Sequence, residues 1–126
     1  MWNDASEPGR IMWADLTVPD APKVRDFYEA VLGWKPSPVS MGDYQDFNML
    51  PPGSNEAAAG VCHARGGNAN LPAQWIVYVP VKDLPASIAT CERLGGKVLQ
   101  RSESGWCLIQ DPAGAVMMVG QATASK

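Results

Sequence analysis

Few side chains in this sequence could carry out acid–base chemistry. The chain has one histidine, His63, directly after Cys62 in the stretch GVCHA. Neighbouring residues of a strand point to opposite faces, so these two are not expected to form a catalytic Cys–His pair. A neutral imidazole could act as a base near neutral pH or hydrogen-bond a ligand. Alternatively, His63 bonds to a turn or to a neighbouring subunit and takes no part in chemistry.

Asp15 is the second candidate, because it lies in the largely apolar segment RIMWADLTV. Its carboxylate either anchors a cationic or hydroxylated ligand or pairs with an arginine such as Arg65 or Arg101, since either would satisfy a half-buried charge. The chain contains no GxSxG, GxGxxG or phosphate-loop spacing, so neither a serine nucleophile nor a nucleotide site is indicated. The sequence assigns no catalytic residue.

Aromatic side chains suggest a binding site of a different kind. The chain has five tryptophans in 126 residues. Trp13, Tyr78 and Trp106 could stack on a planar or apolar molecule, whereas Trp34 and Trp75 are expected to pack in the core or at an interface. We therefore predict a small-molecule ligand of aromatic or apolar character.

Composition restricts the partners and the location. Hydrophobic residues at 46%, charged residues at 18% and a formal net charge of −3 are typical of a soluble globular protein without a basic field for nucleic acid. No apolar run approaches the roughly 20 residues of a membrane helix, and MWNDASEPGR lacks a signal-peptide core. The three cysteines, without a CxxC pair, are expected to be reduced. We predict a cytoplasmic protein with no nucleic-acid and no membrane partner.

The strands and helices that must position these side chains are predicted from a sequence repeat. Shifting the chain by 63 residues aligns five identities within sixteen positions: Val18 with Val81, Asp20 with Asp83, Pro22 with Pro85, Glu29 with Glu92 and Gly33 with Gly96. These residue types suit a strand end, a helix N-cap, a first helical turn and a glycine just past a helix. Apolar residues recur at helical spacing between the caps. Each half is therefore predicted to begin with a strand and an amphipathic helix.

Strand-like segments follow each predicted helix. In the first half they are the proline-broken stretch up to Met41, YQDFNML (44–50) and AAAGVCHA (57–64), and in the second KVLQRSE (97–103), WCLIQ (106–110) and AVMMVG (115–120). Both halves thus follow the order βαβββ. Because the linker RGGNANLP (65–72) is short, we predict a single domain, 1–126, with module one at about 10–64 and module two at about 73–121.

The order and spacing of several segments resemble the vicinal-oxygen-chelate superfamily, which includes glyoxalase I, bleomycin-resistance proteins and extradiol dioxygenases. The segments are VPDAPKVRDFYEAVLGW, GVCHARG, QWIVYVPVKDL, LGGKV and QDPAGAV, so the resemblance covers about Arg10 to Gln121. It implies an α+β fold in which two tandem βαβββ modules form a curved mixed sheet with a concave cup. It also implies a homodimer, with the cup often shaped by both modules or both chains.

Strand alternation indicates which side chains would face such a cup. In RIMWADLTV one face is uniformly apolar and the other is mixed, and QWIVYVPV divides in the same way. Pro80 cannot donate to a ladder, so its strand is expected at a module edge. The predicted ligand-binding residues are Trp13, Asp15, Thr17, His63, Gln74, Ile76, Tyr78, Trp106 and Met118.

The chain departs from the metal-dependent members of the superfamily at their ligand positions. The resemblance places those ligands, usually histidines and a glutamate, at Trp13, Ile76 and Met118. Indole and alkyl side chains offer no lone pair to a hard divalent ion, and a thioether suits Cu(I). We therefore expect neither a catalytic metal nor another cofactor.

Three functions are compatible with this pattern, and the sequence does not decide between a binding protein and an enzyme. The favoured one is a small-molecule-binding glyoxalase/bleomycin-resistance-like protein without the usual metal site. A lyase, isomerase or dioxygenase with a noncanonical metal site, or with none, would require His63, Asp15 or Tyr78 to converge on one point. A structural or protein-interaction domain would lack a cup and would expose an apolar patch beyond the dimer interface.

Overall fold

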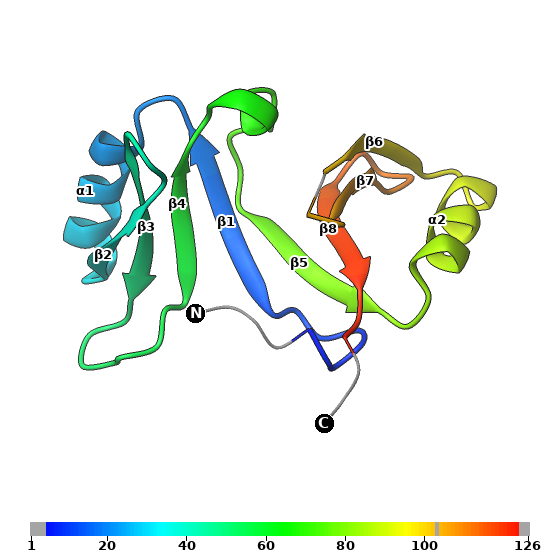
Figure 1. Ribbon diagram of the computed structural model, residues 1–126, viewed down its shortest axis with the longest axis horizontal. Coiled ribbons are helices and arrows are strands. Elements are labelled where there is room, and N and C mark those ends of the chain that lie inside the picture. The colour runs from blue at the N-terminus through cyan, green and yellow to red at the C-terminus, as the bar shows by residue number, and fades with distance from the viewer. Residues whose placement is uncertain (1–4, 103, 124–126) are drawn as a thin grey trace. The chain divides into compact units, whose positions relative to one another are not determined.

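The computed structural model describes residues 5–102 and 104–123 (Figure 1). Within these residues, both halves have the predicted order of one strand, one helix and three strands. The first half contains β1 (Trp13–Val18), α1 (Ala21–Leu32), β2 (Lys35–Ser40), β3 (Gln45–Leu50) and β4 (Ala59–His63). A short 3-10 helix, Gly66–Asn68, lies in the linker, and the second half contains β5 (Ile76–Val81), α2 (Leu84–Arg93), β6 (Lys97–Arg101), β7 (Cys107–Gln110) and β8 (Val116–Gln121).

The described residues form two compact units. Residues 14–75 form the first, and residues 5–13 with 76–123 form the second. The N-terminal segment belongs with the second unit because Gly9 and Met12 donate backbone hydrogen bonds to the carbonyls of Pro80 (2.8 Å) and Tyr78 (2.9 Å). The predicted start of module one, at about residue 10, thus falls in a segment that packs with module two. The single-domain organisation stays a prediction.

Each unit contains a four-stranded mixed sheet. The strand order is β2-β3-β4-β1 in module one and β5-β8-β7-β6 in module two, and the first and last strands of each module are parallel. The registers repeat as well: Asp15 lies beside Gly60, and Tyr78, 63 residues after Asp15, lies beside Met118. Among its own four strands β5 is at the edge, as Pro80 predicted. The α+β fold with two tandem βαβββ modules is therefore confirmed.

The helix caps follow the predicted chemistry. The side chain of Asp20 accepts a hydrogen bond from the Lys23 backbone N–H at 3.2 Å, and Gly33, with φ 75°, ends α1 in the left-handed conformation. Asp83 caps α2 in the same way, accepting from Ala86 at 3.1 Å. Such caps stabilise a helix by about 1 kcal/mol each, because they satisfy amides that the helix leaves unpaired.

The repeated glycine of module two has a different role from that of module one. After α2 the left-handed residue is Gly95, with φ 96°, and Gly96 does not have a positive φ. A Cβ at Gly96 would lie 2.6 Å from the Sγ atom of Cys91 and 2.8 Å from the carbonyl oxygen of Gln110. Gly96 is therefore required for the close approach of α2 to β7, a requirement that the alignment with Gly33 did not reveal.

Each helix covers one face of its own sheet, as Figure 1 shows. The module-one core contains Leu16, Val18, Ala21, Phe47, Met49 and Val61, and Val24, Tyr28, Trp34 and Trp75 pack against it. The predicted packing of Trp34 and Trp75 is confirmed, and Trp75 Nε1 also donates to the Tyr28 hydroxyl at 3.2 Å. In module two, Ile88 of α2 packs on Cys107 and Val119. The face of each sheet that its own helix does not cover is called the open face below.

No helix within the described part of the chain combines the length and the apolar character needed to cross a membrane.

Candidate functional site

The open face of module one is polar. Alternation from the core residues Leu16 and Val61 places Asp15 and Cys62 on this face. In the register, Gly60 lies between Asp15 of β1 and Asn48 of β3. Because Gly60 has no side chain, the carboxylate and the amide face each other across a gap of two strand spacings, about 10 Å. This face thus offers hydrogen-bonding groups on either side of a buried glycine.

Cys62 is held as a neutral thiol on this open face. Burial raises its pKa above the ordinary value, and the negative charges of Asp15 and Asp46, with hydrogen bonds to both carboxylates, raise the pKa further. A thiol in such surroundings donates hydrogen bonds and does not ionise near neutral pH. This raised pKa favours the neutral thiol, which can donate a hydrogen bond to either carboxylate.

His63 lies on the other side of the sheet. Its ring is edge-on to Tyr44, with centroids 5.3 Å apart, and 6.4 Å from the ring of the core residue Phe47. Its Nδ1 atom is 3.3 Å from Oδ1 of Asp46, and its backbone N–H donates to the same oxygen at 2.9 Å. His63 therefore does not share a face with Asp15. This geometry supports the alternative in which its hydrogen bonds are structural.

Asp46 is the residue that sequence reasoning missed. The β3–β4 ladder ends at Phe47 and Val61, and beyond that rung the Asp46 carboxylate accepts the backbone N–H of His63 in place of a backbone carbonyl. The same side chain also bonds the thiol of Cys62. The segment YQDFNML shows a polar residue at this position, but only the strand register reveals that it faces β4.

The two arginines considered as partners of Asp15 have contacts elsewhere. The Arg65 guanidinium lies over the Tyr44 ring, 4.0 Å from its centroid, and 3.8 Å from the exposed carboxylate of Asp43. Nη1 of Arg101 lies 4.0 Å from Sγ of Cys107 in module two. One contact that the structure places at Asp15 is the hydrogen bond with the Cys62 thiol.

The open face of module two is apolar and aromatic. The rings of Tyr78 and Trp106 meet edge to face, with centroids 5.1 Å apart. The indole lies on Gly120, where an added Cβ would be 2.7–2.9 Å from three of its carbons. Met118 lies between Tyr78 and Leu108 in the register. We call Tyr78, Trp106 and Met118 the aromatic wall.

The predicted ligand-binding residues differ in their accessibility. Four are buried: Trp13, Thr17, Ile76 and Met118, which are only 2–6% exposed. Asp15, His63, Tyr78 and Trp106 are intermediate, and Gln74 is exposed in the loop before β5. On the open faces, Asp15 in module one and Tyr78 and Trp106 in module two thus retain surface that a ligand could contact. The ligand role of all nine residues stays a prediction.

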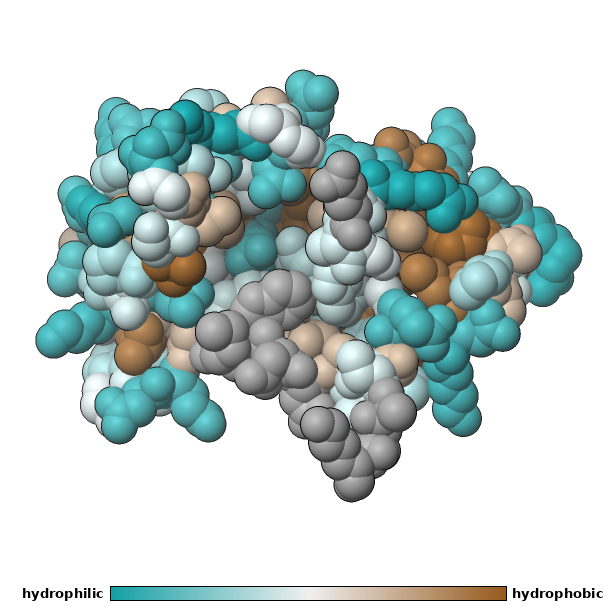
Figure 2. All heavy atoms as spheres, viewed as in Figure 1, coloured by the Kyte–Doolittle hydropathy of each residue, from teal (hydrophilic) through white to brown (hydrophobic). Residues whose placement is uncertain are grey.

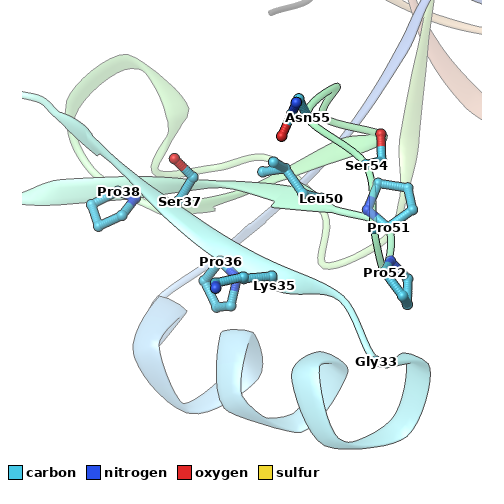
Figure 3. A pocket seen from close by; sticks show the side chains of 11 residues that line it. Gly33, Lys35, Pro36, Ser37, Pro38, Leu50, Pro51, Pro52, Ser54 and Asn55 are labelled. Atoms are coloured by element: carbon cyan, nitrogen blue, oxygen red, sulfur yellow. The ribbon is translucent and has the colours of Figure 1, made fainter.

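A hollow of about 630 Å³ lies at the β2 side of module one (Figure 3). Its lining combines apolar side chains, most of them proline rings, with a few polar groups: Pro36, Pro38, Leu50, Pro51 and Pro52 with Lys35, Ser37, Ser54 and Asn55. The Ser54 hydroxyl is already bonded to the backbone of Glu56. Sequence reasoning did not predict this hollow, because it depends on β2 meeting the loop after β3.

The chemistry of the side chains does not fit the metal site of the superfamily. At the three expected ligand positions, Trp13, Ile76 and Met118 offer an indole, an alkyl chain and a thioether, none of which suits a hard divalent ion. Within residues 5–102 and 104–123, no group of three or more histidine, cysteine, aspartate or glutamate side chains is arranged to hold a metal ion.

The family of the chain follows from comparison with known proteins. A family model described as a glyoxalase-like domain matches residues 12–119, so the chain belongs to the glyoxalase-like family. CFP32 of Mycobacterium tuberculosis, whose name assigns it provisionally to the glyoxylases, is 29% identical over 90% of this chain and 44% of its own length. The anthracycline biosynthesis protein DnrV of Streptomyces peucetius is 30% identical over 89% of this chain and 46% of its own. The chain thus spans about half the length of these relatives.

Two solved structures share the fold. A glyoxalase/bleomycin resistance protein/dioxygenase superfamily member from Vibrio splendidus aligns with a TM-score of 0.56 at 14% identity, over 86% of this chain and 95% of its own. Methylmalonyl-CoA epimerase of Streptomyces coelicolor, in complex with 2-nitronate-propionyl-CoA, aligns with a TM-score of 0.52 at 16% identity, over 94% of this chain and 100% of its own. The resemblance to the vicinal-oxygen-chelate superfamily is confirmed.

Proposed function

We propose that this protein is a glyoxalase-like family member that binds a small molecule without the usual catalytic metal. The observation that carries the proposal is the aromatic wall of module two, where Tyr78 and Trp106 meet at 5.1 Å beside the buried thioether of Met118. The superfamily's metal ligand would stand at Met118, and the neighbouring strand carries Ile76 at another ligand position. Apolar side chains thus stand at positions where the metal-dependent members of the superfamily carry metal ligands.

The ligand that fits such a wall is flat and largely apolar. Two aromatic rings in contact present both a face and an edge, and a planar molecule gains dispersion and hydrophobic contacts from either. The name of the relative DnrV places that protein in anthracycline biosynthesis. This supports beginning with polycyclic aromatic compounds, although the chain covers less than half of DnrV.

Ligand titration tests this function. A hydroxyanthraquinone, a naphthoquinone and a coenzyme A thioester are titrated by calorimetry and by tryptophan fluorescence, with and without EDTA. We expect an aromatic compound to bind equally well in EDTA, and Trp106→Ala to weaken it at least about tenfold, because one aromatic contact contributes about 1.4 kcal/mol.

Tyr44→Ala is the matched control, because Tyr44 is an aromatic residue of module one that contacts His63 and Arg65. This control should leave the affinity unchanged. The proposal fails if no compound binds, if EDTA abolishes binding, or if Trp106→Ala and Tyr44→Ala have equal effects.

An enzyme is the second candidate, because the carboxylates of Asp15 and Asp46 both lie beside Cys62. Carboxylates are general acids and bases in many active sites. Elemental analysis of untagged protein discriminates: stoichiometric Zn, Ni, Mn or Fe would support a noncanonical metal enzyme and contradict the favoured function. Turnover that is lost in Asp15→Asn, with the fold retained, would support catalysis on this face.

We further infer a cytoplasmic homodimer. Exposed hydrophobic residues support self-association: Phe27 and Val31 on α1 are 57% and 59% exposed, and Leu94 and Leu99 in module two are 63% and 48% exposed. Figure 2 shows hydrophobic residues gathered over the part of module two where α2 and β6 lie. Light scattering coupled to size exclusion measures the mass, and a monomer at all concentrations would contradict the dimer.

A further inference from the structure

Strand β2 forms the outer edge of the module-one sheet and contains two prolines, Pro36 and Pro38. Within the described residues, β2 pairs only with β3. The antiparallel register is continuous from Lys35 opposite Leu50 to Ser40 opposite Gln45, with Pro36 opposite Met49 and Pro38 opposite Phe47. The strand thus accommodates both prolines without a break in its pairing.

This register fixes the direction of each backbone group on β2. In an antiparallel ladder, alternate residues exchange both hydrogen bonds with the partner strand, and the residues between them point their N–H and C=O groups outward. Proline has no N–H, so Pro36 and Pro38 cannot be members of the bonded pairs. The bonded residues are therefore Lys35, Ser37 and Val39, and the next bonded position is Met41, whose N–H donates to the Tyr44 carbonyl at 2.8 Å.

The outer edge of β2 consequently lacks most of its hydrogen-bond donors. Three residues of the strand point their backbone outward, and at Pro36 and Pro38 the nitrogen carries no hydrogen. Ser40 alone among these three offers an N–H. A strand added at this edge would leave two of its own carbonyls without a donor, and each unpaired buried polar group costs about 1–3 kcal/mol. Figure 3 shows both prolines on β2, at the hollow that borders this edge.

Strand β6, the outer edge of module two, carries a different interruption. Its pairing with β7 passes from Val98 opposite Ile109 to Gln100 opposite Leu108, so Leu99 is an extra, bulged residue. Lys97 and Arg101 at the two ends of the strand are both exposed. Bulges and charged side chains are common devices on edge strands, because they disturb the flat row of groups that another strand would need.

We propose that the outer edges of both module sheets, β2 and β6, are closed to the addition of another strand, so this protein does not self-associate by extending either sheet. The inference concerns the surface used for assembly and does not depend on which ligand the aromatic wall binds. A homodimer of this chain would have to form through other surfaces.

Restoring the missing donors tests the proposal. The double variant Pro36→Val, Pro38→Val replaces both prolines with a strand-forming residue and supplies two outward amides. We expect concentration-dependent species in sedimentation velocity that are larger than any formed by the wild type. Each variant chain presents two outward donors that a second strand can use, and each hydrogen bond strengthens association by a factor of roughly five. Hydrogen exchange should show the amides introduced at positions 36 and 38 becoming protected as the protein associates.

The matched control is Ser37→Val, Ser40→Val, which adds the same two apolar side chains to β2 but no new outward donor. It should retain the association behaviour of the wild type. The single variants Pro36→Val and Pro38→Val are measured in parallel in case the double variant does not fold.

Two results would overturn the proposal. One is a folded proline-free variant that associates no more strongly than the control. The other concerns the wild type and needs no variant: the outward amide of Ser40 would become protected from exchange as the protein concentration rises.

Discussion

Gly120→Ala is the substitution whose effect follows most directly from the aromatic wall. A Cβ at this position would lie 2.7–2.9 Å from three carbons of the Trp106 indole, whereas carbon atoms in contact are about 3.5–4.0 Å apart. The ring must therefore move by about 1 Å. Overpacking of this kind costs about 2 kcal/mol, and the entropy that alanine removes from the unfolded chain offsets about 0.5 kcal/mol. We expect the free energy of unfolding to fall by about 1.5 kcal/mol.

Urea unfolding monitored by circular dichroism measures this change, and the midpoint of thermal unfolding should fall by about 6 °C. A double-mutant cycle isolates the contact, because in the Trp106→Ala background the added methyl group no longer meets an indole. There Gly120→Ala should be neutral or stabilising by about 0.5 kcal/mol. Gly67→Ala is the matched control, since a Cβ at Gly67 has no neighbour within 4 Å and Gly67 does not have a positive φ.

The same variant links packing to binding. Displacing the indole changes its contact with Tyr78, now at 5.1 Å between centroids, so the aromatic ligand should bind more weakly to Gly120→Ala than to Gly67→Ala. Equal stability losses in the wild-type and Trp106→Ala backgrounds would refute the reasoning, because the cost would then have a cause other than the indole.

Four further predictions concern Asp46 and Cys62 of module one and the N-cap of α2. Asp46→Ala removes the acceptor of the His63 backbone N–H and imidazole and should lower the free energy of unfolding by about 1–3 kcal/mol. The control Asp43→Ala loses an exposed ion pair with Arg65 and should lower it by at most about 0.5 kcal/mol. Equal losses would contradict the role given to Asp46. Because burial and two carboxylates raise the pKa of Cys62, its alkylation in native protein at pH 8 should be far slower than in urea, and Asp15→Asn should accelerate it. The neutral thiol contributes its full stability below the pKa that a cysteine thiol has in the unfolded chain, about 8.5, and this contribution is lost as the pH rises above that value. The difference in urea stability between wild type and Cys62→Ser should therefore shrink from pH 7 to pH 10. A constant difference would argue against a raised pKa for Cys62. Asp83→Ala should destabilise the protein by about 1 kcal/mol, and Asp83→Asn should restore most of the loss, since asparagine also caps; failure of this rescue would show that the capping hydrogen bond from Ala86 is not the cause.

The sequence predicted the parts of the fold that depend on local chemistry. Asp20 and Asp83 cap their helices as expected, and the glycine that ends α1 has the left-handed conformation that glycine adopts most readily. The two copies of βαβββ could be recognised because each element depends on the spacing of apolar residues and on the residue types at its ends. For Gly96 the sequence predicted a glycine just past a helix but not the close approach of α2 to β7 that requires it. Such a contact between a helix and a strand leaves no signal in the neighbouring residues.

The candidate site depended on the tertiary structure to a much greater extent. Alternation separated the apolar face of β1 from its mixed face correctly, but it could not show that Trp13, Thr17, Ile76 and Met118 are almost fully buried. It also could not show that the carboxylate of Asp46 would meet both His63 and Cys62. These features depend on which strands pair and in which register, and a shift of one residue would turn every side chain of a strand to the opposite face.

Taken alone, the sequence determined a doubled βαβββ chain with capped helices and a set of aromatic and acidic side chains, because these properties are set by residues close together along the chain. Only the tertiary structure decided that His63 lies on the helix-covered face beside Phe47, that Trp106 rests on Gly120 beside Tyr78, and that the prolines of β2 point their nitrogens outward. The physical reason is that these contacts and backbone directions depend on residues 9 to 28 positions apart in the sequence and on the strand register. The packing of the whole module determines which of these residues meet.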